Sequence, residues 1–362
     1  KNNVYLTIVG PETPLAMGIV DYFQRRKLRI FGPSLAAAEI ESSKIFSKYF
    51  MRKYNIPTAS FKDFSSAENA IHFLETREFP IVIKTDGLAA GKGAIIARNL
   101  SEAKDAILHM MIEQNFGKAG KRVVIEEFLD GPEISYMAIC DGENVVPLIS
   151  SMDYKRAMDG GTGPNTGGMG AIAPHPLLTP DLEKSVLENV MLPTIDGLKY
   201  ENKPFTGILY AGLILTRRGP KVLEFNCRFG DPETQAVLPL LETDFIEMLL
   251  YAIEGKLDEF DPVWKPEKAL SVVMASGGYP KRFRKAFEIT GLDEIDKNSI
   301  VFQAGTTQKG DTLLSDGGRV IAITSTGHTL EKAAERTYRS VKKINFNKSF
   351  YRSDIGAPFV KR

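Results

Sequence analysis

Short apolar runs alternate with an amphipathic stretch at the start of the chain. Residues 4–9 and 28–31 have the length and apolar character of buried strands, and the apolar spacing over 15–23 is helical. A strand, a helix and a second strand in this order predict a βαβ unit with parallel strands. Because the chain begins at Lys1 without methionine, almost inside its first strand, we expect further strands of this sheet to precede it.

The later pattern predicts two more regions, which begin near the turn at Pro57 and after Trp264. Helical periodicity covers about 36–54, 67–74, 101–111, 179–198 and 330–344. Strand-like runs occupy 123–128, 134–140, 269–276 and 319–325, and a glycine-rich loop is expected over 159–170. We therefore predict a multidomain α/β and α+β chain. Its expected parts are a partial N-terminal βαβ domain at 1–42, a central domain at 43–264 with a smaller subdomain at about 58–128, and a C-terminal α+β domain at 265–362.

A β-branched strand at 81–85, which carries Lys84 near its end, leads directly into a glycine-rich turn that contains a second lysine, Lys92. Glycines lack the Cβ that would keep backbone N–H groups from converging on an anion, and two ammonium groups can neutralise a polyphosphate. The spacing matches neither a Walker P-loop nor a dinucleotide-binding fingerprint. This segment predicts a phosphate-binding turn, although alone it also allows a glycine-rich hairpin with a solvated lysine.

A second polar motif lies on a strand that ends near residue 228. Alternation from Lys221 gives one apolar face, with Leu223, Phe225 and Cys227, and one polar face, with Glu224, Asn226 and Arg228. Hard oxygen ligands suit Mg²⁺, which binds nucleotides through few protein ligands, while a guanidinium matches a carboxylate or acyl phosphate. The strand therefore predicts a metal–nucleotide site with an adjacent anion ligand, unless it is only the solvated face of an edge strand.

Composition excludes several classes of function. The 46 Lys and Arg residues balance 45 Asp and Glu, so the net charge of +1 offers no general attraction for nucleic acid or an anionic membrane. The two cysteines, Cys140 and Cys227, lie far apart in apolar strands, which argues against a disulfide framework or a zinc site and fits a reducing, cytoplasmic compartment. No apolar run approaches the about 20 residues of a membrane-spanning helix.

Taken together, these motifs resemble those of the phosphoribosylamine–glycine ligases, or glycinamide ribonucleotide synthetases, of the ATP-grasp superfamily. The resemblance rests on segments spread over the whole chain: 7–12, 81–93, 124–129, 162–170, 224–235 and 351–356. It implies an ATP-grasp fold at the centre of the chain, after a partial Rossmann-like N-terminal domain and before the C-terminal domain. The family's opening strand and Gly-Arg-Glu-His-Ala turn are not in this sequence.

The resemblance also implies an activity. Family members join glycine to 5-phosphoribosylamine through glycyl phosphate while ATP is cleaved to ADP and phosphate, in the second step of purine synthesis. The implied cofactor is Mg²⁺ or Mn²⁺, and the implied partners are small molecules, with neither nucleic acid nor membrane. A transient contact with the preceding pathway enzyme and the oligomeric state are left open.

Carried over residue by residue, the resemblance implies an ATP site. Lys84, Lys92 and Lys44 correspond to phosphate-binding lysines, with Lys48 as a rival to Lys44. Backbone groups of residues 126–129, which form the hinge, are expected to bind adenine, and the carboxylate of Glu133 is expected to bind the ribose hydroxyls. The remaining implied ATP-binding residues are Gly87, Gly91 and Gly93 in the turn, Glu126, Glu127, Phe128 and Leu129 in the hinge, and Glu133 at the ribose.

The same comparison implies the metal and substrate residues. Glu224 and Asn226 match the metal ligands, and Arg228 matches the ligand for the glycine carboxylate or acyl phosphate, so that Arg228 and Lys92 are the expected catalytic residues. Tyr154 stands where the family usually has histidine, and a tyrosine cannot act as a base near neutral pH. The expected substrate-binding residues are Glu12, Asp153, Lys155, Arg156, Pro164, Asn165, Thr166, Gly167, Gly168, Arg228 and Asp231.

Three alternatives remain at this stage. Another ATP-grasp ligase of purine synthesis, such as the formate-using glycinamide ribonucleotide transformylase, would share the lysines and the metal strand. The chain could instead be a nucleotide-binding module without catalysis, or one segment of a multifunctional polypeptide. Residues 163–170 and 228–235 argue against the transformylase, and the intact lysines and metal strand argue against a non-catalytic module.

Overall fold

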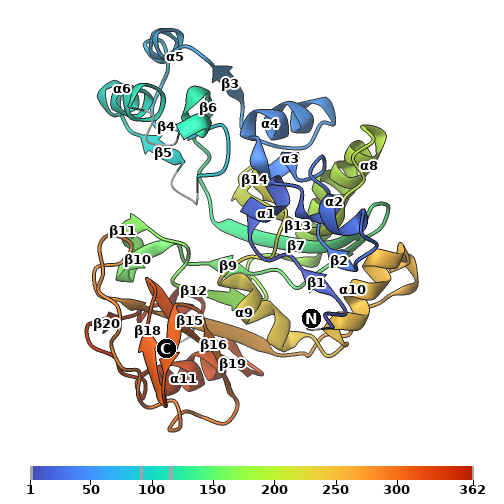
Figure 1. Ribbon diagram of the computed structural model, residues 1–362. Coiled ribbons are helices and arrows are strands. Elements are labelled where there is room, and N and C mark those ends of the chain that lie inside the picture. The colour runs from blue at the N-terminus through green and yellow to red at the C-terminus, as the bar shows by residue number, and fades with distance from the viewer. Residues whose placement is uncertain (1–2, 90–92, 114–116, 361–362) are drawn as a thin grey trace. The chain divides into compact units, whose positions relative to one another are not determined.

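The computed structural model describes residues 3–89, 93–113 and 117–360 (Figure 1). The chain forms two compact units, each assembled from several segments. The first unit comprises Lys1–Leu148, Thr179–Phe229 and Ile246–Asp261, and the second comprises Ile149–Leu178, Gly230–Phe245 and Pro262–Arg362. Among the described residues, no helix is both long and apolar enough to cross a membrane.

The first unit begins with the predicted βαβ arrangement. Strand β1 (Thr7–Ile8) pairs in parallel with β2 (Ile30–Phe31). The expected single helix is instead two, α1 (Glu12–Ala16) and α2 (Ile19–Gln24), because Gly18 between them has a left-handed conformation with φ of 77°. The strands are shorter than the apolar runs that predicted them.

A small antiparallel sheet in the same unit carries the glycine-rich turn. Its strand order is β3-β6-β4-β5, and helices α5 and α6 pack against it through an apolar core (Figure 1). Ser66 caps α5 by accepting from the Asn69 N–H at 3.3 Å. The elements are β3 (Phe61–Phe64), α5 (Ala67–Leu74), β4 (Ile81–Thr85), β5 (Ala94–Ala97), α6 (Leu100–Ile107), the π-helical segment Leu108–Ile112 and β6 (Val123–Glu127).

A second antiparallel sheet in this unit has the order β14-β13-β7-β8 and carries the predicted metal strand. Helices α3, α4 and α7 contact β14. The strands are β7 (Glu133–Asp141), β8 (Val145–Pro147), β13 (Thr206–Thr216) and β14 (Gly219–Asn226). The helices are α3 (Glu39–Ser42), α4 (Lys44–Lys53), α7 (Pro180–Val186), the π-helical segment Leu187–Met191, α8 (Leu192–Tyr200) and α10 (Phe245–Glu254), which enters this unit at Ile246.

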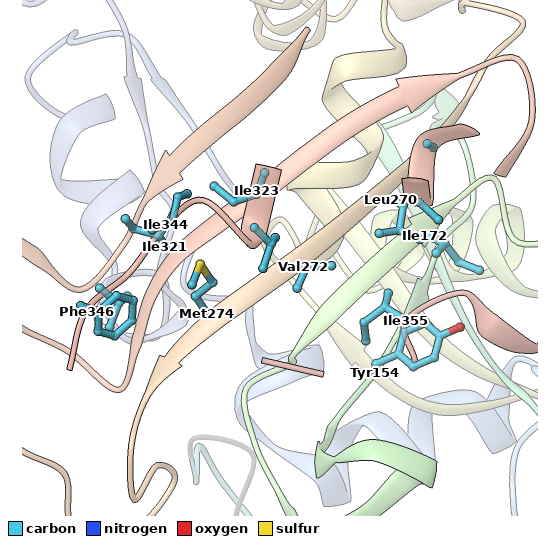
Figure 2. Packing of buried hydrophobic residues seen from close by; sticks show 14 of the residues in the cluster. Tyr154, Ile172, Leu270, Val272, Met274, Ile321, Ile323, Ile344, Phe346 and Ile355 are labelled. Atoms are coloured by element: carbon cyan, nitrogen blue, oxygen red, sulfur yellow. The ribbon is translucent and has the colours of Figure 1, made fainter. Parts of the chain in front are cut away.

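The second unit is built on a sheet with the order β16-β19-β15-β12-β9, to which β20 adds beside β15. Figure 2 shows the core around Leu270, Val272 and Ile323. Helix α11 packs on β15 and β19 and contributes Ala333, Ala334 and Val341 to this core. The elements are β9 (Met152–Asp153), β12 (Gly170–Ala173), α9 (Glu233–Val237), β15 (Lys268–Ser276), β16 (Ser299–Gln303), β17 (Thr306–Lys309), β18 (Thr312–Ser315), β19 (Arg319–Gly327), α11 (Leu330–Val341) and β20 (Ser349–Phe350).

The expected loop at 159–170 is only partly a loop. Strands β10 (Arg156–Met158) and β11 (Thr162–Asn165) form an antiparallel hairpin around Asp159–Gly161. The sequence pattern did not predict these two strands, because glycine is unfavourable in strands and several glycines lie in and beside the turn that joins them.

Candidate functional site

Two buried lysines meet one buried glutamate in the first unit. The Nζ atoms of Lys48 and Lys84 lie 2.9 and 3.1 Å from Oε2 of Glu126, and all three side chains are almost completely buried. Lys84 also donates to the carbonyl oxygen of Leu223 at 2.9 Å, and Lys48 donates to Oγ1 of Thr58 at 2.8 Å. We call Lys48, Lys84 and Glu126 the lysine–glutamate cluster.

Local structure explains why these charges converge. In the β4–β6 pair Lys84 stands opposite Val124 and Val82 opposite Glu126, so Lys84 and Glu126 are diagonal neighbours on one face of the sheet. Lys48 comes from α4, and burial lowers its pKa to about 8 although Glu126 opposes the shift. Lys48, which the sequence offers as a rival to Lys44, is thus buried against Glu126 beside Lys84.

The start of the glycine-rich turn is tied to the beginning of α4. Asp86 Oδ1 accepts from Ser43 Oγ at 3.0 Å and from the Ile45 N–H at 3.1 Å, while Lys44 Nζ donates to the Gly87 carbonyl at 3.0 Å. Gly87 has φ of 134°, and a Cβ there would lie 2.8 Å from that of Ala119, so another residue would be strained. Lys44 therefore lies at the turn, whereas Lys48 lies in the lysine–glutamate cluster.

The predicted Gly91 and Lys92 fall at 90–92, outside the described residues. Gly93 closes the turn, since its carbonyl accepts from the Thr85 N–H at 2.8 Å. The turn is thus anchored at both of its described ends.

The expected adenine hinge follows β6 directly. Glu127 accepts from Lys221 Nζ and from the Ser60 N–H, each at 3.0 Å, and Phe128 is 37% exposed. Leu129 lies in the loop before β7, and Glu133 is exposed at the start of that strand. The side chains of Glu126 and Glu127 are engaged with lysines, which leaves backbone groups as the means by which this hinge could bind a base.

A β-bulge shapes the predicted metal strand. Gly212 pairs with Glu224 but Leu213 pairs with Val222, so Leu223 is the extra residue of β14. The expectation that Leu223 shares the buried face is therefore wrong, and Val222 takes that place. The bulge is also where the Leu223 carbonyl accepts from Lys84, which joins the metal strand to the lysine–glutamate cluster.

The polar face of β14 fits a hard divalent cation. Glu224 is exposed and Asn226 half-buried, two residues apart on one face, and they present carboxylate and amide oxygens. Across β13 their partners are Gly212 and Tyr210, neither of which is acidic. The described residues contain no cluster of three or more His, Cys, Asp or Glu suited to a metal. Nucleotide-bound Mg²⁺ typically has one or two protein ligands, and phosphate oxygens and water complete its coordination shell.

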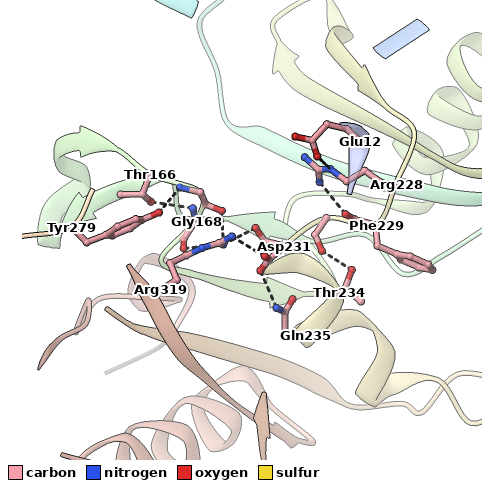
Figure 3. A network of polar contacts seen from close by, with 12 residues as sticks. Glu12, Thr166, Gly168, Arg228, Phe229, Asp231, Thr234, Gln235, Tyr279 and Arg319 are labelled. Carbon is pink, nitrogen blue, oxygen red and sulfur yellow. Dashed lines mark hydrogen bonds and ion pairs between the residues drawn. The ribbon is translucent and has the colours of Figure 1, made fainter. Parts of the chain in front are cut away.

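Arg228 follows the end of β14 and is oriented by an ion pair. Its Nε lies 3.2 Å from Oε2 of Glu12, and its Nη1 donates to the Phe229 carbonyl at 2.9 Å (Figure 3). The preceding N–H, of Cys227, donates to Oε2 of Glu41 at 2.7 Å. Glu41, which the sequence did not single out, is 9% exposed, and burial raises its pKa to about 7 although Arg228 and the Cys227 N–H oppose the shift.

Replacing Glu41 by glutamine is expected to change how stability depends on pH. A carboxyl with a folded pKa of about 7 and an unfolded pKa near 4.5 contributes stability below the lower value, which is lost as pH rises through the upper one. The free energy of unfolding of Glu41→Gln should therefore rise relative to that of the wild type by about 3 kcal/mol as the pH is raised from about 4.5 to about 8. Urea unfolding across this range measures the difference.

Glu39→Gln on the same helix is the matched control, because Glu39 is more exposed and pairs with Lys203 at 2.7 Å. A difference between Glu41→Gln and wild type that stays constant with pH would contradict the raised pKa of Glu41.

The cysteines take no part in this chemistry. Cys140 and Cys227 are both buried, and burial raises the pKa of each thiol. Neither side chain is therefore a reactive thiolate at neutral pH.

In the second unit, the predicted acceptor segment starts with an anchored tyrosine. Tyr154 is 7% exposed, and its hydroxyl accepts from the Gly356 N–H at 2.9 Å. Burial raises its pKa, which removes it further from a role as a base. Asp153 ends β9, Lys155 follows Tyr154 in the short link between the strands, and Arg156 begins β10. Arg156 Nη1 donates to the Gly163 carbonyl at 2.8 Å across the hairpin.

The motif at 351–356 fastens this hairpin. Arg352 makes a two-pronged ion pair with Asp354, at 2.7 and 2.8 Å, and donates to the Arg156 carbonyl at 3.1 Å. Asp354 accepts from the Gly160 N–H at 2.8 Å, and Asp159 accepts from Ser353. The sequence carried this motif only as part of a resemblance; here its role is to fix 156–160.

The tip of the acceptor segment is held by polar contacts within the second unit (Figure 3). Thr166 Oγ1 donates to the Lys155 carbonyl at 2.8 Å and accepts from the Gly168 N–H at 3.0 Å. Gly168 has φ of 109°, and a Cβ there would overlap Pro232 and lie 2.7 Å from Asp153 Oδ1, so only glycine fits. Pro164 and Asn165 are exposed on β11.

Asp231 is bound within the same unit. Its Oδ2 lies 2.7 Å from Nη2 of Arg319, and its Oδ1 accepts from Gln235 Nε2 at 2.9 Å. The structure thus brings together the expected residues 166–168 and Asp231 through Arg319, which sequence reasoning missed. The sequence feature that could have indicated Arg319 is its position after two glycines and directly before the apolar run 320–323.

Comparison with known protein families gives a match to each part of the chain. The model described as phosphoribosylglycinamide synthetase, N domain, matches residues 1–41. The ATP-grasp (A) domain model of the same family matches 42–234, and its C domain model matches 269–358.

Individual relatives agree with these models. Phosphoribosylamine–glycine ligase of Vibrio vulnificus (strain YJ016) is 47% identical over 99% of this chain and 84% of its own length. The enzyme of the same name from Ralstonia nicotianae is 48% identical over 100% of this chain and 86% of its own.

Solved structures extend the comparison to the fold. The crystal structure of phosphoribosylamine–glycine ligase from Thermotoga maritima has a TM-score of 0.85 and 36% identity, covering 93% of this chain and 84% of that one. Biotin carboxylase from Campylobacter jejuni has a TM-score of 0.76 over 98% of this chain and 82% of that one, at 14% identity, and shares the fold alone.

Proposed function

The chain belongs to the phosphoribosylglycinamide synthetase family, and we propose that it ligates glycine to 5-phosphoribosylamine at the expense of ATP. The product is glycinamide ribonucleotide, formed with ADP and phosphate in purine biosynthesis. The observation that carries this proposal is the joining of the lysine–glutamate cluster to the polar strand β14 through the bulge at Leu223. This hydrogen bond links a lysine that we assign to the phosphates with the strand that we assign to the metal, within the first unit.

The reaction proceeds in two steps. A carboxylate oxygen of glycine attacks the γ-phosphorus of ATP, the bond to ADP breaks, and glycyl phosphate forms. The amine of phosphoribosylamine then attacks the carbonyl carbon, phosphate leaves with the oxygen that glycine supplied, and the nitrogen loses a proton. Neither step needs a covalent bond to the protein, so positioning and charge neutralisation supply the catalysis.

Each set of nucleotide-binding residues has a distinct task in this proposal. Lys84, with Lys92 and Lys44 from the two sides of the turn, neutralises the phosphates. Lys48 supports Lys84 through Glu126, since both ammonium groups share one carboxylate oxygen. Backbone groups of residues 126–129 bind adenine, and Glu133 binds the ribose.

Glu224 and Asn226 would hold Mg²⁺ or Mn²⁺ together with phosphate oxygens. The cation supplies charge neutralisation at the transferring phosphoryl group when bound. Arg228, oriented by Glu12, binds the glycine carboxylate and later the acyl phosphate. Asp153, Lys155, Arg156, residues 164–168 and Asp231 form the acceptor site. A cytoplasmic location and a transient contact with the enzyme that supplies phosphoribosylamine complete the proposal.

The experiment that tests this function is ADP release by the purified chain with different carboxylates. ADP should form with glycine and phosphoribosylamine together and glycinamide ribonucleotide should accumulate in equal amount, while formate with glycinamide ribonucleotide should give none. Release with formate would assign the chain to another ligase of the superfamily. Nucleotide binding without turnover would indicate a binding module.

Arg228→Lys is expected to keep ATP binding and lose glycine-dependent turnover. Lysine retains the charge but cannot form the two parallel hydrogen bonds that a guanidinium gives to a carboxylate. We expect kcat/KM for glycine to fall by about ten- to a hundredfold. Steady-state kinetics against glycine, with calorimetric ATP binding, measures both quantities.

Arg122→Lys serves as the control, since Arg122 pairs with Asp63 at 2.6 Å elsewhere in the same unit. Equal losses of ATP and glycine binding in Arg228→Lys would place Arg228 in the nucleotide site instead.

A further inference from the structure

One arginine holds together two segments of the second unit that the proposed function assigns to the acceptor. Nη1 of Arg319 donates to the Gly167 carbonyl at 2.7 Å and to the Asp231 carbonyl at 2.9 Å, and Nη2 donates to Asp231 Oδ2 at 2.7 Å (Figure 3). Arg319 opens β19 and is 21% exposed at its side chain. A single planar group thus binds residues 167 and 231, which are far apart in sequence.

Gly167 is held on both of its peptide groups. Its N–H donates to the Tyr279 hydroxyl at 3.1 Å, while its carbonyl accepts from Arg319. A Cβ at Gly167 would lie 3.0 Å from Cζ of Arg319, so the missing side chain lets the backbone approach the guanidinium. Because Gly167 lies beyond the end of β11, these side chains replace the ladder bonds that a strand would provide.

The other end of this arrangement is equally fixed. Asp231 follows Arg228 by three positions in the chain and begins the turn that leads into α9. Its carboxylate is shared between Arg319 and Gln235, so the turn cannot rotate without breaking a charged hydrogen bond.

We propose that Arg319 is a positioning residue for the acceptor substrate, which sets the conformation of residues 166–168 and of Asp231 as one unit. It acts through these segments, with Tyr279 as its second support. The inference rests on the proposed function, because it concerns how the acceptor site of that reaction is preorganised. The shape of a guanidinium is required: an ammonium group cannot donate in the same plane to two carbonyls and a carboxylate.

Arg319→Lys is therefore expected to raise KM for glycinamide ribonucleotide in the reverse reaction by about tenfold or more. Glycinamide ribonucleotide replaces the unstable phosphoribosylamine as the probe. The affinity for ADP should change by less than about twofold, since the described hydrogen bonds of Arg319 go to residues 167, 168 and 231, none of which is assigned to the nucleotide. Tyr279→Phe keeps the ring, which packs on Phe283, and should raise the same KM by a smaller factor.

Arg336→Lys is the matched control. Arg336 also donates to a backbone carbonyl, that of Thr326 at 2.7 Å, and lies 3.8 Å from Asp296, but it contacts neither acceptor segment. If Arg319 were only structural, Arg319→Lys and Arg336→Lys would lower the melting temperature to a similar extent. In neither variant would KM for glycinamide ribonucleotide then rise while the affinity for ADP stayed the same. An unchanged KM in both Arg319→Lys and Tyr279→Phe would overturn the inference. An inactive wild-type enzyme in the same assay would overturn the proposed function instead.

Discussion

Glu126→Ala is expected to destabilise the first unit by about 3–5 kcal/mol, because it leaves two buried ammonium groups without their carboxylate. Glu126 Oε2 is the acceptor for both Lys48 and Lys84, and the pairs are nearly inaccessible to water. Desolvation already lowers the pKa of Lys48 to about 8, and removing the carboxylate removes the interaction that opposes this shift. Urea unfolding near neutral pH measures the loss.

The neighbouring residue provides the control. Glu127 pairs with Lys221 at 3.0 Å but is 42% exposed at its side chain, so Glu127→Ala should cost about 1 kcal/mol or less. Adding Lys48→Met to Glu126→Ala removes one of the two uncompensated charges and should recover part of the stability. Similar costs for Glu126→Ala and Glu127→Ala would contradict the buried cluster.

Glu224→Ala is expected to reduce glycine-dependent ADP formation by about a thousandfold while nucleotide binding is retained within a few-fold. The substitution removes the charged member of the proposed ligand pair, but it leaves the hinge and the lysines in place. Asn226→Ala removes a neutral ligand and should have a smaller effect. Steady-state ADP release at saturating Mg²⁺, together with calorimetric ATP binding, measures both quantities.

Glu143→Ala is a suitable control for this loss of charge, since Glu143 is an exposed residue of the same unit that pairs with Lys199. Wild-type turnover in Glu224→Ala would refute the metal assignment, and a parallel loss of ATP affinity would move Glu224 to the nucleotide-binding residues.

Local patterns predicted much of the fold. The helix expected at 67–74 is α5 with the same bounds, since its apolar spacing and its Ser66 cap are both local signals. The alternation that put Glu224 and Asn226 on one face also holds. Both features depend on residues that are neighbours along the chain.

Other features depend on partners distant in sequence, and there local reasoning failed. Lys48 lies on helix α4, and its burial depends on contacts with Glu126 of strand β6 and with Thr58, which local spacing along the helix cannot indicate. The bulge at Leu223 is set by pairing with β13, which alternation within β14 cannot indicate. Arg319 lies far along the chain from the glycines that it holds. Such contacts follow from topology and register, not from local propensity.

The most direct test of the proposed ligation uses glycine labelled with ¹⁸O in its carboxylate. If the carboxylate attacks ATP and phosphate later leaves the acyl carbon, one labelled oxygen must pass from glycine to each phosphate released. Mass spectrometry of the phosphate formed in the presence of ATP and phosphoribosylamine should find this label, and its amount should match the ADP produced. Unlabelled phosphate, with both labelled oxygens still on glycine, would contradict carboxylate activation and with it the central claim that this chain is the ligase.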